Sequence, residues 1–124
     1  MEEINRITEQ ILKYAFQVHS KLGPGLLESS YQECLYYVLK KNGIYTEKEK
    51  PMPLVYEEIK MDIGYRVDLL VEQKVIVEIK TVESFNDVHI AQVLTYLKLS
   101  GCKVGLLLNF HTAHLKNGIK RLVL

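Results

Sequence analysis

One stretch near the end of the chain, residues 103–110, constrains the fold more than any other. Its central sequence Val-Gly-Leu-Leu-Leu is apolar without alternation. A strand with one side in water alternates apolar and polar residues, so this run predicts a strand that is buried on both faces. Such a strand needs covering layers on either side. The neighbouring segments must therefore supply helices as well as partner strands.

Three segments carry apolar residues at helical spacing. The helices are expected over residues 4–22, 27–41 and 87–100. Gly23-Pro24-Gly25 ends the first, because glycine suits a left-handed cap and proline cannot continue the hydrogen-bond ladder. Asn86 or Asp87 caps the start of the third.

The remaining periodic segments are rich in β-prone residues. The strands are expected over residues 44–50, 54–56, 63–71, 74–82, 103–110 and 119–124. The first is polar and suits a sheet edge; Pro51 and Pro53 interrupt it, and we expect residues 54–56 to resume it. The runs on either side of Glu72-Gln73 predict a hairpin.

The order of these elements favours one architecture. A strand–helix–strand segment requires a parallel strand pair, whereas the hairpin before it is antiparallel. We therefore predict an α/β fold in which a mixed β-sheet is flanked by helices. At 124 residues the chain corresponds to one domain over residues 1–124.

Composition narrows the function classes. The formal net charge of +1 is far from that of a strongly basic nucleic-acid-binding chain, so any such contact depends on a local patch. The acidic N-terminus lacks the apolar core of a secretory signal, and no apolar run is long enough to span a membrane. Cys34 and Cys102 lack metal-ligand spacing and are expected to be buried reduced thiols. We therefore expect a cytoplasmic protein.

The triplet Glu78-Ile79-Lys80 places a carboxylate and an ammonium on one face of a strand, because side chains two residues apart share a face. The pattern is weak alone, since Glu58-Ile59-Lys60 and Glu72-Gln73-Lys74 repeat it. The position of other polar groups must distinguish the three triplets.

Asp68 lies ten residues before Glu78. If the hairpin turns through residues 72–74, opposed residues have numbers that sum to 146, and Asp68 faces Glu78 at a Cβ separation of roughly 4.5–5.5 Å. Two carboxylates at that distance disfavour double ionisation, and a divalent cation with a preference for oxygen ligands, Mg²⁺ or Mn²⁺, resolves the conflict. The alternative from the residues alone is a ladder of mutually bridging charges: Arg66, Asp68, Glu78 and Lys80.

Polar residues on two of the helices could join this pair. Glu28 and Tyr31 share a helix face with Gly25, although Glu28 also suits the first turn simply as an acid near the helix dipole. Gln92 and Tyr96 lie four residues apart on the third helix, with His89 one turn earlier. Surface positions are the alternative for these side chains. The pair His111 and His114 lacks a nearby acidic cluster, so we expect no metal site there.

Taken together, these residues resemble the active-site signature of the PD-(D/E)XK nuclease superfamily. Glu28 and the Gln92-x-x-x-Tyr96 pattern are similar to the additional motifs of its RecB-like branch. The chain as a whole resembles the small bacterial family of GxxExxY proteins, whose name fits Gly25-x-x-Glu28-x-x-Tyr31. Other similar stretches are residues 18–25, 105–110 and 117–121.

The resemblance implies a restriction-endonuclease-like core with an extra N-terminal helix. It implies that Asp68, Glu78 and the Ile79 carbonyl bind Mg²⁺ or Mn²⁺, with Glu28 binding directly or through water. Lys80 would position the attacking water, and Gln92 would orient Lys80 or the substrate. Tyr96 would pack behind Gln92, and His89 is an accessory candidate.

Three functions follow from this reading. The first is a Mg²⁺-dependent nuclease that hydrolyses phosphodiester bonds in DNA, or secondarily RNA. The second is a non-catalytic nucleic-acid or protein-interaction module on a nuclease fold. The third is a homodimeric structure-specific endonuclease. A basic groove, if one exists, would draw on Lys40, Lys41, Lys48, Lys50, Lys60, Lys116, Lys120 and Arg121.

Overall fold

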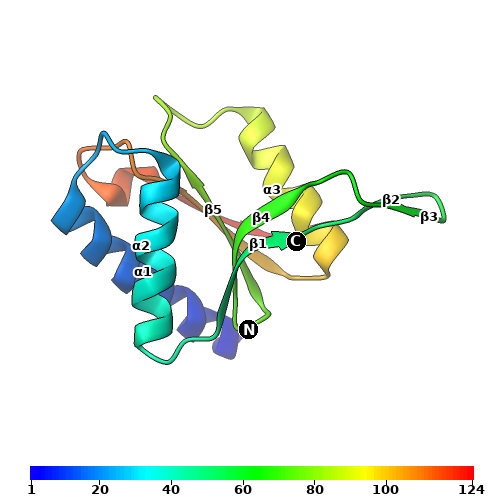
Figure 1. Ribbon diagram of the computed structural model, residues 1–124, viewed down its shortest axis with the longest axis horizontal. Coiled ribbons are helices and arrows are strands. Elements are labelled where there is room, and N and C mark those ends of the chain that lie inside the picture. The colour runs from blue at the N-terminus through cyan, green and yellow to red at the C-terminus, as the bar shows by residue number, and fades with distance from the viewer.

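The computed structural model describes residues 1–124 as a five-stranded sheet between helices (Figure 1). Helices α1 (Glu2–Leu22) and α2 (Glu28–Lys41) pack on one face. Helix α3 (Asp87–Ser100) packs on the other. All three predicted helices are confirmed, and none of them is both long and apolar enough to cross a membrane.

The sheet has the strand order β1-β4-β5-β6-β7. Its strands are β1 (Thr46–Pro51), β4 (Arg66–Val71), β5 (Val75–Lys80), β6 (Val104–Asn109) and β7 (Ile119–Val123). Strands β5 and β6 are parallel and α3 connects them, whereas every other neighbouring pair is antiparallel. The predicted mixed sheet is therefore confirmed, with β1 at an edge as expected. A short 3₁₀ helix, η1 (Leu115–Gly118), leads into β7.

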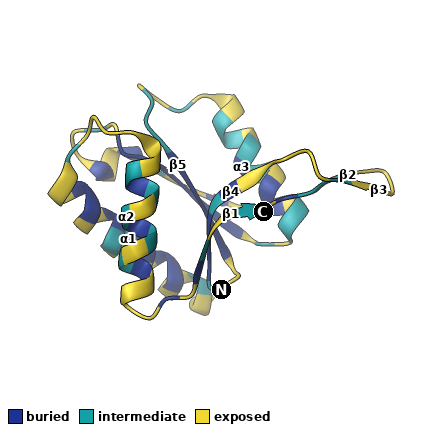
Figure 2. Ribbon diagram, in the orientation of Figure 1, coloured by how far each residue is buried: buried dark blue, intermediate teal, exposed yellow.

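Strand β6 is buried along its whole length, as its apolar run predicted. Leu106 and Leu108 pack with α1 and α2, while Leu107 packs with α3. Figure 2 shows the buried sheet between helices whose outer faces are exposed. Gly105 allows α3 to approach closely, because a Cβ at this position would lie 2.8 Å from Val93 Cγ1.

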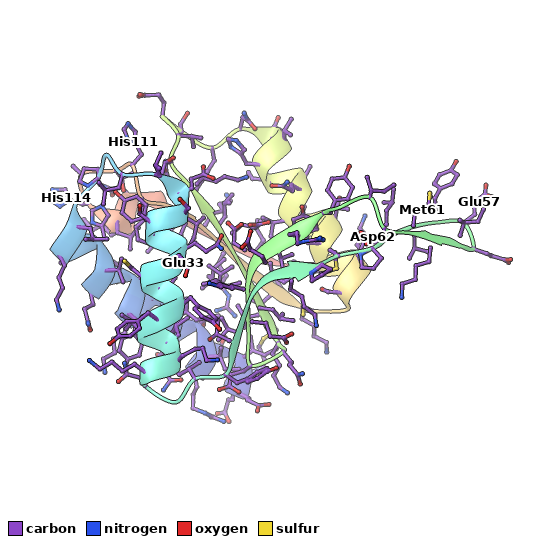
Figure 3. All side chains as sticks on the ribbon, in the orientation of Figure 1. Glu33, Glu57, Met61, Asp62, His111 and His114 are labelled. Carbon is purple, nitrogen blue, oxygen red and sulfur yellow. The ribbon has the colours of Figure 1, made fainter.

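Residues 54–61 depart from the expected path. Strand β2 (Leu54–Tyr56) does not resume the edge strand; it pairs with β3 (Ile59–Met61) in a separate two-stranded ribbon. This ribbon projects from the body, and Figure 3 labels Glu57, Met61 and Asp62 along it. The prolines explain the change, because Pro51 and Pro53 have no N–H to continue the ladder.

Candidate active site

The β4–β5 hairpin has the predicted register. Its paired residues, Leu69 with Val77, Leu70 with Ile76 and Val71 with Val75, all have numbers that sum to 146. The next step outward along both strands reaches Asp68 and Glu78. The turn is tight, with positive φ angles of 53° at Glu72 and 56° at Gln73.

The two carboxylates continue the hairpin where its backbone pairing stops. The Asp68 N–H donates to Glu78 Oε2 at 3.3 Å, and the Ile79 N–H donates to Asp68 Oδ2 at 2.8 Å. Each side chain therefore binds the backbone of the opposite strand. This reciprocal arrangement fixes both carboxylates in place without using all of their oxygen atoms.

Glu78 is only 3% exposed. Burial, followed by the hydrogen bond and the negative charge of Asp68, raises the pKa of Glu78 from 4.5 to about 9. The positive charge of Lys80 acts in the opposite direction but does not offset these causes. At neutral pH without a cation, Glu78 therefore holds a proton next to Asp68.

Lys80 and Gln92 meet across the gap between β5 and α3. Lys80 Nζ donates to Gln92 Oε1 at 3.1 Å, and Gln92 Nε2 donates to the Tyr96 hydroxyl at 3.4 Å. Burial, then the charge of Glu78, raises the pKa of Tyr96, so its hydroxyl stays protonated at neutral pH. The helical spacing of Gln92 and Tyr96 thus produces one chain of contacts that ends at Lys80.

The alternative ladder of charges does not form. Strands β4 and β5 are interior strands of the sheet. None of the four ion pairs in the molecule includes Arg66, Asp68, Glu78 or Lys80. The other two Glu-x-Lys triplets are also separate from the site: Glu58 lies exposed on the ribbon, and Glu72 accepts from the Tyr45 N–H at the surface.

Glu28 lies in the first turn of α2 and reaches the end of strand β5 at which Lys80 is located. Its Oε2 accepts from the Thr81 N–H at 3.1 Å and lies 3.5 Å from Thr81 Oγ1. Thr81 directly follows Lys80, so Glu28 lies beside the end of β5. No three His, Cys, Asp or Glu side chains cluster closely enough to hold one ion. Glu28 therefore does not form one cluster with the carboxylate pair.

Tyr31 and His89 serve local structure. The buried Tyr31 hydroxyl donates to the Gly23 carbonyl at 2.6 Å and accepts from the Leu26 N–H at 3.1 Å. His89 Nδ1 accepts from the Asn86 N–H at 3.1 Å as part of a capping box that begins α3. Ile79 is a core side chain, so only its backbone is available to the site.

The remaining histidines lie away from the carboxylate pair. His111 and His114 belong to the segment between β6 and η1, at the far end of the molecule from the ribbon (Figure 3). His111 Nε2 is 3.8 Å from Glu83 at the exposed surface. His19 is buried, with Nε2 2.8 Å from the Thr112 carbonyl oxygen.

Three of the basic residues considered for a groove lie at opposite edges of the sheet. Lys48 pairs with Glu33 at 2.7 Å, and Lys50 pairs with Glu47 at 2.9 Å, both on β1. Arg121 lies on β7, at the opposite edge of the sheet, and its guanidinium donates to α1. These three residues are thus divided between the two edge strands, β1 and β7.

Two residues near the ends of β5 and β6 were not predicted from the sequence. Thr81 donates to Glu28, and Asn109 forms hydrogen bonds to both backbone groups of Val82. The sequence feature that could have identified Asn109 is its polar amide, which follows directly after the apolar run of residues 104–108. Thr81 had no signal, because its shorter contact with Glu28 uses the backbone N–H, which does not depend on the residue type.

Comparisons with known proteins agree with this fold. A family model described as the PD-(D/E)XK nuclease superfamily matches residues 5–122. Among solved structures, the crystal structure of SSO0001 is similar in fold, with a TM-score of 0.55 and 19% sequence identity over 94% of this chain and 77% of that one. No curated protein matches the sequence. Because the family model spans nearly the whole chain and the mixed sheet has the corresponding architecture, the chain belongs to the PD-(D/E)XK nuclease superfamily.

Proposed function

We propose that the protein is a Mg²⁺-dependent nuclease that hydrolyses phosphodiester bonds in DNA, with RNA as the second choice of substrate. The single observation that carries this proposal is the pairing of the buried Glu78 with the half-buried Asp68. Its reciprocal backbone bonds hold two acidic groups side by side, and the pKa of Glu78 is raised to about 9. A divalent cation would replace the proton and stabilise both charges.

The donor set fits such an ion. Asp68 and Glu78 each use one oxygen atom for a backbone N–H, which leaves the other oxygen of each group without a backbone donor. The Ile79 carbonyl is a further oxygen ligand in this proposal, and Glu28 binds through water. Carboxylate, carbonyl and water oxygens are the ligands that Mg²⁺ and Mn²⁺ prefer.

The remaining residues have distinct roles in this mechanism. A bound metal ion would lower the pKa of water and polarise a phosphoryl oxygen. Lys80 holds the attacking water and offsets the charge that develops on the phosphate. Gln92 keeps the Lys80 ammonium in position through their 3.1 Å hydrogen bond, and Tyr96 supports Gln92 from behind.

Membership in the RecB-like branch and in the GxxExxY family is part of the proposal. Two features support it. Glu28 begins α2 beside the end of β5, and Tyr31 closes the loop that precedes Glu28. Gln92 and Tyr96 follow on the helix after the two site strands.

The nuclease proposal is tested with purified protein, single-stranded, duplex and branched DNA, single-stranded RNA, and Mg²⁺ or Mn²⁺. Asp68→Asn keeps the shape of the side chain but removes its charge, so we expect cleavage to fall at least about 100-fold. Glu58→Gln is the matched control, because it alters the exposed Glu-x-Lys triplet on the ribbon, and its rate should equal that of the wild type. Equal cleavage by Asp68→Asn and wild type would overturn the assignment.

A non-catalytic interaction module is the second candidate. The observation in its favour is that Lys48 and Lys50 are paired with carboxylates and Arg121 lies at the opposite sheet edge, so these three residues do not form one basic surface. Calorimetry with Mn²⁺ separates the two candidates. Binding that disappears in Asp68→Asn supports the nuclease, and no binding by the wild type supports the module.

A homodimeric structure-specific endonuclease is the third candidate. The ribbon of β2 and β3 exposes apolar side chains, with Tyr56 66% and Ile59 62% exposed. Two-stranded ribbons are marginally stable alone in water, so cover by another molecule would stabilise this one. Sedimentation that shows only monomer, with and without branched DNA, would exclude this form of the enzyme.

A further inference from the structure

We infer that Asn109 is a positioning residue that holds the Glu28 side of the proposed site in place. The inference rests on the proposed function, because it assigns Asn109 to the same site. The Asn109 side chain forms no hydrogen bond with the carboxylate pair or with Lys80; it acts through the backbone segment that follows β5.

The Asn109 amide extends the pairing of β5 with β6 beyond the last residues of both strands. The ladder ends where Lys80 is opposite Asn109. There, Asn109 Oδ1 accepts from the Val82 N–H at 3.1 Å, and Nδ2 donates to the Val82 carbonyl at 2.8 Å. A side-chain amide has thus replaced a peptide group as the partner of Val82.

This contact controls the position of Thr81. Phe110 N–H donates to the Lys80 carbonyl at 2.9 Å on one side of Thr81, and Asn109 holds Val82 on the other. Between these two anchors, the Thr81 N–H points to Glu28 Oε2 at 3.1 Å. Without the Asn109 amide, the segment would lose its second anchor, and the Thr81–Glu28 hydrogen bond would lose its geometry.

Phe110, the residue after Asn109, supports the Glu28 side of the Thr81–Glu28 hydrogen bond. The Phe110 ring stacks on Tyr31, with 4.6 Å between ring centroids. Tyr31 in turn binds the Gly23 carbonyl and the Leu26 N–H, in the loop that leads to Glu28. Adjacent residues at the end of β6 therefore anchor both sides of the Glu28–Thr81 contact.

The surroundings of Asn109 are built to fit it closely. It is 2% exposed and is the one polar residue of β6. The Asn109 carbonyl accepts from Thr112 Oγ1 at 3.1 Å, and a Cβ at Gly118 would lie 2.4 Å from the same carbonyl oxygen. A buried amide is costly unless it is bonded, and an apolar residue would serve the core alone. The hydrogen bonds of the amide offset this cost, and all of them go to backbone groups, those of Val82 and the His111 N–H.

The first test measures Mn²⁺ affinity by titration calorimetry in Asn109→Ala, well below its melting temperature. We expect the affinity to fall roughly tenfold, the effect typical of losing an outer-shell partner of a metal site. Asn42→Ala is the matched control, since Asn42 Nδ2 also donates to a backbone carbonyl, that of Val38, at the exposed end of α2. Its affinity should stay within about twofold of the wild type.

A double-mutant cycle with Glu28→Gln then asks whether Asn109 acts through Glu28. If it does, the loss of Mn²⁺ affinity in the double variant is smaller than the product of the two single losses. A role confined to global stability leaves the affinity of folded Asn109→Ala unchanged, or gives additive losses. Either result would overturn the inference. Asn109→Ser, whose hydroxyl retains one hydrogen-bonding group, is the second variant and guards against a failure to fold.

Amide hydrogen exchange in the metal-free protein separates this inference from the proposed function. We expect the Thr81 and Val82 amides to exchange faster in Asn109→Ala, while the Val77 amide in the middle of β5 is unchanged. Equal exchange at Thr81 in both proteins overturns the positioning role even if the wild type binds Mn²⁺. Failure of the wild type to bind Mn²⁺ or cleave any nucleic acid overturns the proposed function even if Thr81 is loosened.

Discussion

At the scale of single residues, the site depends on where Glu78 lies in the sheet. A glutamate on an edge strand would remain hydrated, but β5 is an interior strand, and Glu78 is 3% exposed. Asp68 then adds a second acidic group across the hairpin. Burial and the neighbouring Asp68 together raise the pKa of Glu78. The position is therefore unfavourable for a free carboxylate anion and favourable for a carboxylate bound to a cation.

The raised pKa predicts the pH dependence of stability in the metal-free protein. The pKa of Glu78 is about 9 in the folded protein, whereas its ordinary value, which applies to the unfolded chain, is 4.5. The contribution of the bound proton to the free energy of unfolding is thus complete below pH 4.5, and it is lost as the pH rises toward about 9. Glu78→Gln removes this dependence and should be more stable than the wild type, by a few kcal/mol, at the alkaline end.

Urea denaturation in a chelator, across this pH range, measures the effect as the difference in unfolding free energy between the two proteins. Glu58→Gln is the control, because Glu58 is exposed on the ribbon and should leave the slope unchanged. Parallel curves for the wild type and Glu78→Gln would show that Glu78 ionises normally in the folded protein.

At the scale of elements, the contact between α3 and β6 sets the distance from Gln92 to Lys80. Gly105 lies under α3 and permits this contact, since a Cβ there would be 2.8 Å from Val93 Cγ1 and 3.5 Å from Leu97 Cδ2. The closeness of the helix brings Gln92 within 3.1 Å of Lys80. A displaced α3 would carry the Gln92 amide away from the ammonium.

Gly105→Ala should therefore lower the free energy of unfolding by about 1–3 kcal/mol, the usual cost of overpacking a core. Chemical denaturation measures this change. The double variant Gly105→Ala/Val93→Ala returns space at the contact, so it should be less destabilised than the sum of the two single variants. Strict additivity would mean that the added methyl group does not meet Val93.

The ribbon of β2 and β3 illustrates how an element changes its role through backbone chemistry. The β-prone residues 54–56 were expected to continue the sheet edge, which was wrong. Pairing of β1 with β4 ends at Pro51 and Arg66, and a last Met52–Tyr65 backbone hydrogen bond precedes the ribbon. Local β propensity was right, but the partner strand, β3, was not expected from the sequence.

At the scale of the whole molecule, the proposed metal ligands lie in the middle of the sheet. Strands β4 and β5 pair with β1 and β6 and contribute to the core on both sides. A cation bound by Asp68 and Glu78 would therefore be linked to global unfolding. An ion bound elsewhere on the folded protein would stabilise it as well, so the Asp68→Asn variant is needed to locate the site.

We expect Mn²⁺ to raise the melting temperature of the wild type, by an amount that corresponds to about 2.7 kcal/mol at a hundredfold excess over its dissociation constant. The increase should be larger at higher pH, because the ion competes with the Glu78 proton. Differential scanning calorimetry of the wild type and Asp68→Asn measures it. The same increase in both proteins would place the bound ion elsewhere.

The sequence alone determined the features that depend on local spacing. The apolar periodicities defined three helices and the doubly buried strand β6, and the short turn set the hairpin register that brings Asp68 opposite Glu78. Both follow from geometry over a few consecutive residues. Only the tertiary structure decided the contacts of Glu28 with Thr81, of Lys80 with Gln92 and of Asn109 with Val82. These depend on how α2, α3 and β6 pack on the sheet, and packing across distant elements is not encoded in the spacing of any one of them.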